Sequence, residues 1–298
     1  MRKNNSPTIK QHYIPQYYLR GFSKDGNCVF QYDVNEMKQL PLTHVKEICF
    51  EKNLYEFYDC NNNIVARNSV ENKLRHWESI FNNNIIEIKE KSQKVSKFPH
   101  MSFLSEKQMA VLIFNMAIQV LRMPNIIQSG TDIFLNMNKD LITSNQARNH
   151  TILECLPVHK PLDINENSIL NTVIKWFENM YFCVGITEKS NIFTGDMPVV
   201  LYSDDVSKAI NGEKKANDIT YPLTSNLVLF MMPPDDSKAQ FDNVLFKMSD
   251  SQVELAKDRI VSLTNRWIYS ENELSEDDIR IIKKYKIAKK QLINPTSE

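Results

Sequence analysis

The sequence contains little glycine: six residues in a chain of 298, against an average usage of roughly 7%. Loops that wrap phosphate groups with backbone N–H groups depend on glycine. Neither the dinucleotide pattern G-x-G-x-x-G nor the P-loop pattern G-x-x-x-x-G-K-S/T occurs. These absences disfavour two large classes of nucleotide-binding protein.

The chain also has no net charge, because 36 Lys and Arg residues balance 36 Asp and Glu residues. Proteins that coat nucleic acid through bulk electrostatics carry a clear positive excess. The balance therefore argues against that class, although it is compatible with a local basic patch.

Cysteine and long apolar runs are scarce as well. The five cysteines are odd in number, widely spaced and form no C-x-x-C pair, so neither a disulfide framework nor a zinc ribbon is indicated. No stretch approaches the roughly 20 apolar residues of a membrane span. The polar first residues lack the apolar run of a signal peptide. We expect a cytoplasmic protein that does not enter the membrane.

Apolar spacing and turn residues predict the elements of secondary structure. Helices are expected over 68–91, 105–123, 126–148, 168–179, 251–263 and 275–291. Strands are expected over 28–32, 54–58, 181–187, 191–194, 199–202 and 227–232, with the segment 267–269 between the last two helices and an exposed loop over 208–218.

This order predicts an α+β fold with a central helical layer and a strand-rich C-terminal half, helix-dominated overall. We expect a single domain over residues 1–298. Within it, residues 10–60 form an N-terminal motif with short strands, 65–150 a helical region, 165–270 an α/β region and 271–298 a C-terminal helix.

The helix predicted over 105–123 carries one narrow polar line. It is apolar on nearly all sides, which is typical of a buried helix, yet Asn115, Gln119 and Arg122 follow each other at i, i+4 and i+7. A buried arginine requires a carboxylate, a phosphate or a comparable acceptor. The line is either a solvent-facing stripe, a structural arginine–carboxylate pair or the wall of a pocket.

The preceding helix carries Glu71, Arg75 and Glu78 at the same spacing, beside its apolar stripe. These residues can form ordinary ion pairs within the helix. Glu78 follows Trp77 at the edge of the stripe, so it is also a candidate partner for Arg122.

Near the N-terminus, His12, Gln16 and Arg20 lie at i, i+4 and i+8 in an aromatic segment. If a helix begins after Pro15, Gln16 and Arg20 share one face. Histidine titrates near neutral pH and can act as an acid, a base or a ligand. The alternative is a buried histidine that fixes the N-terminal arm to the core.

The segment Thr194-Gly195-Asp196-Met197-Pro198 places one carboxylate between two apolar runs. An Asp at the end of a strand is a common metal ligand or general base. An Asp is equally common in a β-turn, where its side chain stabilises the backbone of that turn.

In this order, the motifs resemble a mainly bacterial family catalogued as domain of unknown function 4238. The resemblance starts with the segment from His12 to Phe22 and continues through the Glu71/Glu78 helix, Gln119-x-x-Arg122-x-Pro124, and the Asp196 turn. It also includes 221–225 and Asn265-x-x-x-Tyr269. It spans about residues 10–270. In that family the Asp turn usually reads Thr-Ser-Asp-Asn-Pro, whereas this chain has Gly195 and Met197. The resemblance supports the choice of residues and implies no particular reaction.

Our leading hypothesis is a phosphodiester-directed hydrolase, a nuclease-like effector of phage defence; the defence context is implied by the kind of family resembled. His12, Glu78 and Asp196 would be catalytic, with Glu78 and Asp196 also holding a divalent metal such as Mg²⁺. Gln16, Arg20, Gln119 and Arg122 would bind the anionic substrate, a nucleic acid, nucleotide or phosphosugar. The alternative is a non-enzymatic binding or scaffold module in which the same residues form a structural network.

Overall fold

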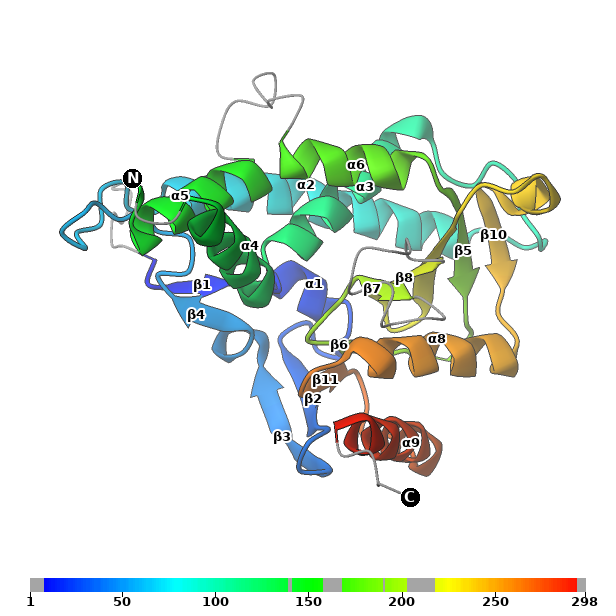
Figure 1. Cartoon of the computed structure of the whole chain (residues 1–298). Coiled ribbons are helices and arrows are strands. Elements are labelled where there is room, and N and C mark those ends of the chain that lie inside the picture. Colours follow the sequence, from blue (N-terminus) through cyan, green and yellow to red (C-terminus); the bar gives the residue numbers. More distant parts are fainter. Residues whose placement is uncertain (1–7, 139–140, 158–167, 190, 203–217, 294–298) are drawn as a thin grey trace, which may run out of the picture. The chain divides into compact units, whose positions relative to one another are not determined.

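A computed structural model describes residues 8–138, 141–157, 168–189, 191–202 and 218–293 (Figure 1). The chain falls into two compact units, each assembled from separate stretches of sequence. The first unit consists of Met1–Pro15, Cys49–Asn84 and Lys107–Glu178, and the second of Gln16–Ile48, Ile85–Glu106 and Asn179–Glu298. The two units are described separately, and the expected single domain stays a prediction.

The first unit is mainly helical. Its strands β1 (Lys10–His12) and β4 (Phe50–Lys52) form a small antiparallel sheet. Its helices are the first part of α2 (Ser69–Gln93), nearly all of α3 (Glu106–Leu121), α4 (Pro124–Met137), α5 (Ser144–Cys155) and α6 (Ile169–Glu178).

Apolar spacing explains the helices that carry the candidate residues. Val70, Leu74 and Phe81 of α2 recur at helical intervals and are at most 2% exposed. α3 ends where the chain reaches Met123, which has the extended backbone that a residue before proline prefers. Pro124 then opens α4 at a position where a missing N–H costs nothing.

The second unit contains two sheets. The larger has the strand order β10-β5-β9-β8-β7, formed by β5 (Tyr181–Ile186), β7 (Val200–Tyr202), β8 (Asp218–Thr224), β9 (Leu227–Met232) and β10 (Val244–Lys247). All neighbours are antiparallel except β10 and β5, which are parallel. β9 is almost wholly buried because it is the middle strand of the five and consists of apolar residues.

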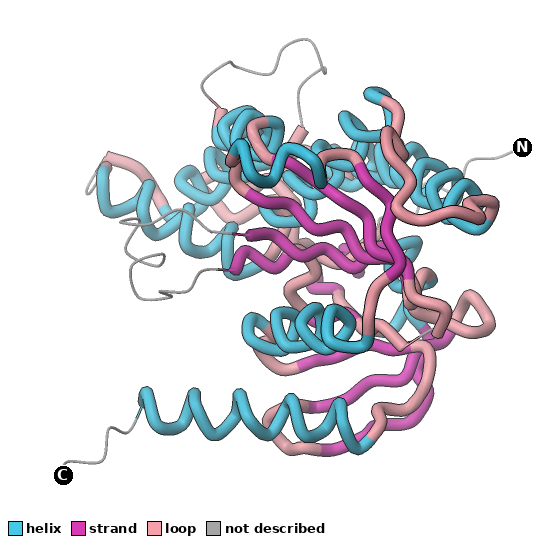
Figure 2. Tube along the Cα trace, turned by 90° about the vertical axis from the view of Figure 1, so that its right-hand side faces the viewer, coloured by secondary structure: helices cyan, strands magenta, loops and turns pink. Residues whose placement is uncertain are grey.

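The smaller sheet has the order β3-β2-β11-β6 and is antiparallel throughout. Its strands are β2 (Cys28–Asp33), β3 (Lys38–His44), β6 (Thr194–Gly195) and β11 (Trp267–Ser270). The unit also contains α1 (Gln16–Arg20), the 3₁₀ helices η1 (Val45–Glu47) and η3 (Asp236–Phe241), α8 (Asp250–Leu263) and α9 (Glu276–Ile293). Within this unit, α8 lies between the larger sheet and α9 (Figure 2).

The predicted fold class is wrong in its emphasis. The described chain is α+β, but with about 46% helix and 22% strand in three sheets it is not the helix-dominated chain that we expected. The C-terminal half is rich in strands, as predicted, since β5 to β11 lie between Tyr181 and Ser270. Four strands lie within the first 52 residues. β2 was predicted over 28–32, but the other three were not. β1 and β4 are only three residues long and pair with each other across a long stretch of sequence, and β3 contains Pro41, so alternation within one segment does not reveal them.

Two predicted elements are also wrong. The helix expected over 126–148 is two helices, α4 and α5, and α5 begins with a capping box formed by Thr143 and Gln146. The strand expected over 54–58 forms only the isolated bridge between Tyr58 and Ile64. The backbone N–H of Tyr55 donates to the Gln11 side chain instead of a strand ladder.

The remaining long elements are confirmed with small shifts at their ends, and the expected strand over 191–194 is reduced to β6. The exposed loop expected over 208–218 lies outside the described residues except for Asp218, which begins β8. In the part of the chain that the structure describes, no single helix is long and apolar enough to cross a bilayer. α3 and α4 meet that test only as a pair, which is bent by 67°.

Candidate functional site

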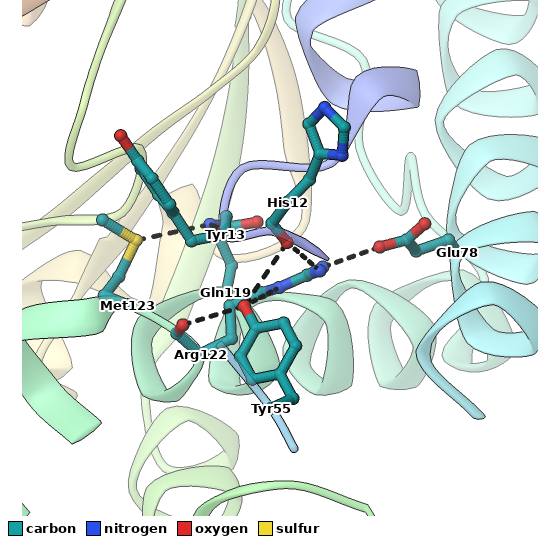
Figure 3. Close-up of polar contacts among 7 residues, drawn as sticks. All are labelled: His12, Tyr13, Tyr55, Glu78, Gln119, Arg122 and Met123. Atoms are coloured by element: carbon teal, nitrogen blue, oxygen red, sulfur yellow. Dashed lines mark hydrogen bonds and ion pairs between the residues drawn. The ribbon is translucent and has the colours of Figure 1, made fainter. Parts of the chain in front are cut away.

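Arg122 follows the last turn of α3 and is the largest fully buried side chain of the chain's described core, only 2% exposed. Each of its three guanidinium nitrogens donates a hydrogen bond to a protein acceptor (Figure 3). Nη1 donates to Oε1 of Glu78 at 2.8 Å, Nη2 to the carbonyl oxygen of His12 at 2.5 Å, and Nε to the Tyr55 hydroxyl at 3.3 Å. The buried charge is thus paired and hydrogen-bonded, as burial requires.

The Tyr55 hydroxyl links the backbone of Arg122 to that of His12. Its hydroxyl lies 3.0 Å from the carbonyl oxygen of Arg122 and 3.3 Å from that of His12, and can donate to either. Burial raises the pKa of Tyr55 to about 12, with Arg122 acting in the opposite direction. Burial also disfavours the charged guanidinium, but Tyr55 and Glu78 outweigh it and raise the pKa of Arg122. At neutral pH the arginine is therefore charged and the tyrosine neutral.

The N-terminal arm is held through its backbone. Nε2 of Gln119 donates to the carbonyl oxygen of Tyr13 at 3.0 Å, one residue beyond the carbonyl that Arg122 binds. The His12 imidazole points away from the guanidinium (Figure 3) and packs edge-on against Phe50, with the ring centroids 5.6 Å apart. His12 thus contributes its carbonyl oxygen to this cluster, and its ring lies outside it.

Glu71 lies two turns before Glu78 on α2. Burial raises the pKa of its carboxyl, the Glu78 carboxylate acts in the same direction, and Arg122 opposes both. Its Oε2 is buried without a hydrogen-bond partner among the described residues. Of the two carboxylates on α2 that interact with Arg122, Glu78 is therefore well paired and Glu71 is poorly satisfied.

Gln16, Arg20 and Asp196 belong to the second unit. Gln16 and Arg20 share a face of α1, as predicted, and Nη2 of the exposed Arg20 donates to Oε1 of Gln16 at 3.4 Å. The bond is long and solvent-exposed, so it contributes little stability.

Asp196 caps a distant turn. Its Oδ1 accepts from the backbone N–H of Asn265 at 2.8 Å, and its Oδ2 accepts from those of Arg266 and Trp267 at 2.8 and 3.1 Å. The side chain is 7% exposed. Both carboxylate oxygens thus stabilise the chain between α8 and β11.

The structure brings together one part of the predicted site. Arg122, Glu78, Gln119 and the His12 backbone meet in the first unit, and the predicted Arg122–Glu78 pair is confirmed. Gln16, Arg20 and Asp196 lie in the other unit. Among the described residues, no group of three or more His, Cys, Asp or Glu side chains is placed to hold a metal ion. The catalytic, substrate-binding and metal-binding roles stay predictions.

Sequence reasoning missed Tyr55 and two neighbouring buried residues. Gln11 and Glu56 are fully buried, and Nε2 of Gln11 donates to Oε1 of Glu56 at 2.7 Å. Oε1 of Gln11 accepts the backbone N–H of Tyr55 at 2.6 Å. Gln11 adjoins His12, and Glu56 adjoins Tyr55, but neither lies on a periodic face. No spacing rule would have paired them.

Residues 10–273 match the family described as protein of unknown function (DUF4238). No curated protein and no solved structure matches the chain.

Proposed function

We propose, for a chain that belongs to the DUF4238 family, that the polar residues around Arg122 form a structural network in a non-enzymatic binding or scaffold module. The observation that carries this proposal is the guanidinium of Arg122. It is 2% exposed, and all three of its nitrogens donate to protein acceptors. A substrate-binding arginine would instead direct donors to a free anion.

The contacts of His12 and Asp196 favour the same interpretation. The carbonyl oxygen of His12 accepts from Arg122, whereas its imidazole packs against Phe50. The Asp196 carboxylate accepts three backbone hydrogen bonds. A metal ligand would need the carboxylate oxygens of Asp196, which these backbone hydrogen bonds occupy. A general acid would need the His12 imidazole, whereas His12 joins the network through its carbonyl oxygen.

The test compares His12→Ala with Asp196→Ala in thermal denaturation and in a Mg²⁺-supplemented assay against RNA, DNA and nucleotides. A structural network predicts no hydrolysis by the wild-type chain. It also predicts a much lower melting temperature for Asp196→Ala, and a small change for His12→Ala, which keeps the carbonyl. Hydrolysis by the wild-type chain that disappears in a His12→Ala variant of normal stability would overturn the proposal.

The second candidate is the phosphodiester-directed hydrolase, with a role in bacterial phage defence and a nucleic acid, nucleotide or phosphosugar as substrate. One observation favours it: the Glu78 side chain is 27% exposed beside a buried arginine. A carboxylate in that position could bind a divalent metal or activate water. The assay above tests this candidate directly.

We also propose a cytoplasmic location. All five cysteines are free thiols, which a reducing compartment maintains. Fractionation of cells that express the chain tests this part.

A further inference from the structure

The second unit contains a cavity of about 490 Å³ between the larger sheet and α8. Ligand pockets in proteins usually occupy about 300–1,000 Å³. The cavity shares no residue with the Arg122 network, so the inference below goes beyond the proposed function and does not depend on it.

Strand register explains the apolar wall of the cavity. Cys183 of β5 is paired with Phe230 of β9 on one side and Val244 of β10 on the other, so the three side chains emerge on the same face. Phe246 lies two residues beyond Val244 and returns to that face. All four line the cavity, and the rings of Phe230 and Phe246 lie 6.1 Å apart.

α8 forms the opposite wall of the cavity with a stripe of residues that is separate from its buried stripe. Gln252, Leu255 and Arg259 of α8 follow at i, i+3 and i+7 and line the cavity. The residues that α8 buries, such as Val253 and Ile260, belong to another stripe. The helix therefore packs in the unit with one side and faces the cavity with the other.

Large apolar side chains are exposed at this cavity. Met101, Phe241 and Leu255 are 53%, 49% and 47% exposed, and all three line it. They come from a loop, from η3 and from α8. Isolated exposed apolar residues need no explanation, but a group around one cavity marks a binding site for an apolar partner.

The charges at the cavity cancel. Nη2 of Arg259 donates to Oδ2 of Asp218 at 2.6 Å, and Nη1 donates to the hydroxyl of Thr220 at 3.3 Å. The side chains of Arg259 and Asp218 are 12% and 24% exposed. Burial raises the pKa of the Cys183 thiol to about 12, so that group is uncharged at neutral pH. An anion would therefore find no uncompensated positive charge among the lining residues.

We propose that this cavity binds a neutral, largely apolar small molecule with an aromatic ring. Two observations define the ligand class: the aromatic and aliphatic walls, and the Arg259–Asp218 pair, which leaves no net charge. An aromatic ring would pack against Phe230 and Phe246 in the tilted geometry that such rings prefer.

A pair of fluorescent probes tests both parts of the proposal on the full chain. N-phenyl-1-naphthylamine is neutral, and 8-anilinonaphthalene-1-sulfonate has the same aromatic skeleton with one negative charge. We expect saturable binding of the neutral probe, with an affinity about tenfold or more above that of the sulfonate. Absence of saturable binding, or equal or tighter binding of the sulfonate, would overturn the proposal.

A substitution that fills the cavity tests whether the neutral probe binds there. Leu255→Trp places a larger side chain at the cavity, and the control Leu42→Trp changes the same residue type at a similar exposure, 52%, on β3. The neutral probe, excited outside the absorption of tryptophan, should bind Leu255→Trp about tenfold more weakly and Leu42→Trp as it binds the wild type. Because both positions are half exposed, both variants should fold, which their circular dichroism spectra establish. Equal binding to the two variants would contradict the assignment of this cavity.

Discussion

Arg122 illustrates how one side chain can join three parts of a folded unit. It connects α3 to Glu78 of α2, to the β1 backbone at His12, and to Tyr55. A network of this kind is expensive to disturb, because removal of one member leaves the others buried without partners. The residue scale therefore offers the most direct tests.

Arg122→Met should lower the free energy of unfolding by about 3 kcal/mol, because it removes the charge that pairs with Glu78 in a largely buried setting. Urea denaturation measures this loss. The control is Arg20→Met, which removes an exposed arginine whose only described acceptor is a 3.4 Å contact and should change the stability by less than about 0.5 kcal/mol. Equal effects of the two substitutions would refute the network.

Glu71→Gln should stabilise the chain at neutral pH. The folded-state pKa of Glu71 is raised by burial, so the native state retains a proton that the unfolded state releases between the unfolded value, roughly 4.3, and the folded value. The carboxylate thus reduces stability above the folded pKa, and this cost disappears as the pH falls below the unfolded value.

Gln removes the ionised group, so the variant should be more stable by about 1 kcal/mol at pH 7 and equal to the wild type near pH 4. Denaturation at a series of pH values checks this. Exposed Glu87 on the same helix provides the control substitution Glu87→Gln. A stability difference at Glu71 that does not change with pH would contradict the argument.

At the scale of elements, Gly195 determines how closely β6 approaches the end of α8. A Cβ at this position would overlap the hydroxyl of Thr264, which donates to the Ile260 carbonyl at 2.8 Å. A glycine at position 195 and the hydroxyl of Thr264 are therefore sterically complementary.

Gly195→Ala should therefore cost about 1–3 kcal/mol of stability through overpacking, and Thr264→Ala should recover part of that loss. A double-mutant cycle by chemical denaturation measures the coupling, which we expect to be about 1 kcal/mol or more. Additive effects of the two substitutions would show that the close approach does not matter.

The same elements show how far sequence reasoning reaches. Long, periodic elements such as α2 and β9 were predictable because their own residues carry the apolar pattern. Short strands such as β1 and β4 were not, because their pairing depends on partners far along the chain. The residues of a short strand do not indicate which distant segment will pair with it.

The candidate site divides in the same way. The Arg122–Glu78 pair was predictable, since both residues stand out as polar positions beside apolar helix faces. The other contacts were not, because Arg122 and Gln119 bind carbonyl oxygens of β1 and the residue after it, and Asp196 binds backbone N–H groups. Every residue has a backbone carbonyl and every residue except proline has a backbone N–H, so the sequence cannot indicate which of these groups will be used.

At the scale of the whole molecule, the chain passes repeatedly between its two units. α2 begins in the first unit at Ser69 and ends in the second at Gln93, so one continuous helix belongs to both. We therefore expect loss of structure in either unit to disturb the helix that the other uses. This connectivity supports the prediction of a single domain that unfolds cooperatively.

Three buried thiols can test that cooperativity. Cys49 and Cys155 report on the first unit and Cys183 on the second, and each is at most 7% exposed. Burial raises the pKa of Cys155 to about 11 and that of Cys183 to about 12, so these thiols react only after opening. Exposed Cys60 gives the labelling rate of an accessible thiol.

In moderate urea, the three buried thiols should react with a maleimide at one common rate in the wild type. That rate should rise equally for all three in Arg122→Met and in Gly195→Ala, although one substitution lies in each unit. Mass spectrometry of the labelled peptides measures each site separately. If Arg122→Met accelerated only Cys49 and Cys155, and Gly195→Ala only Cys183, the two units would open independently and the single-domain prediction would be wrong.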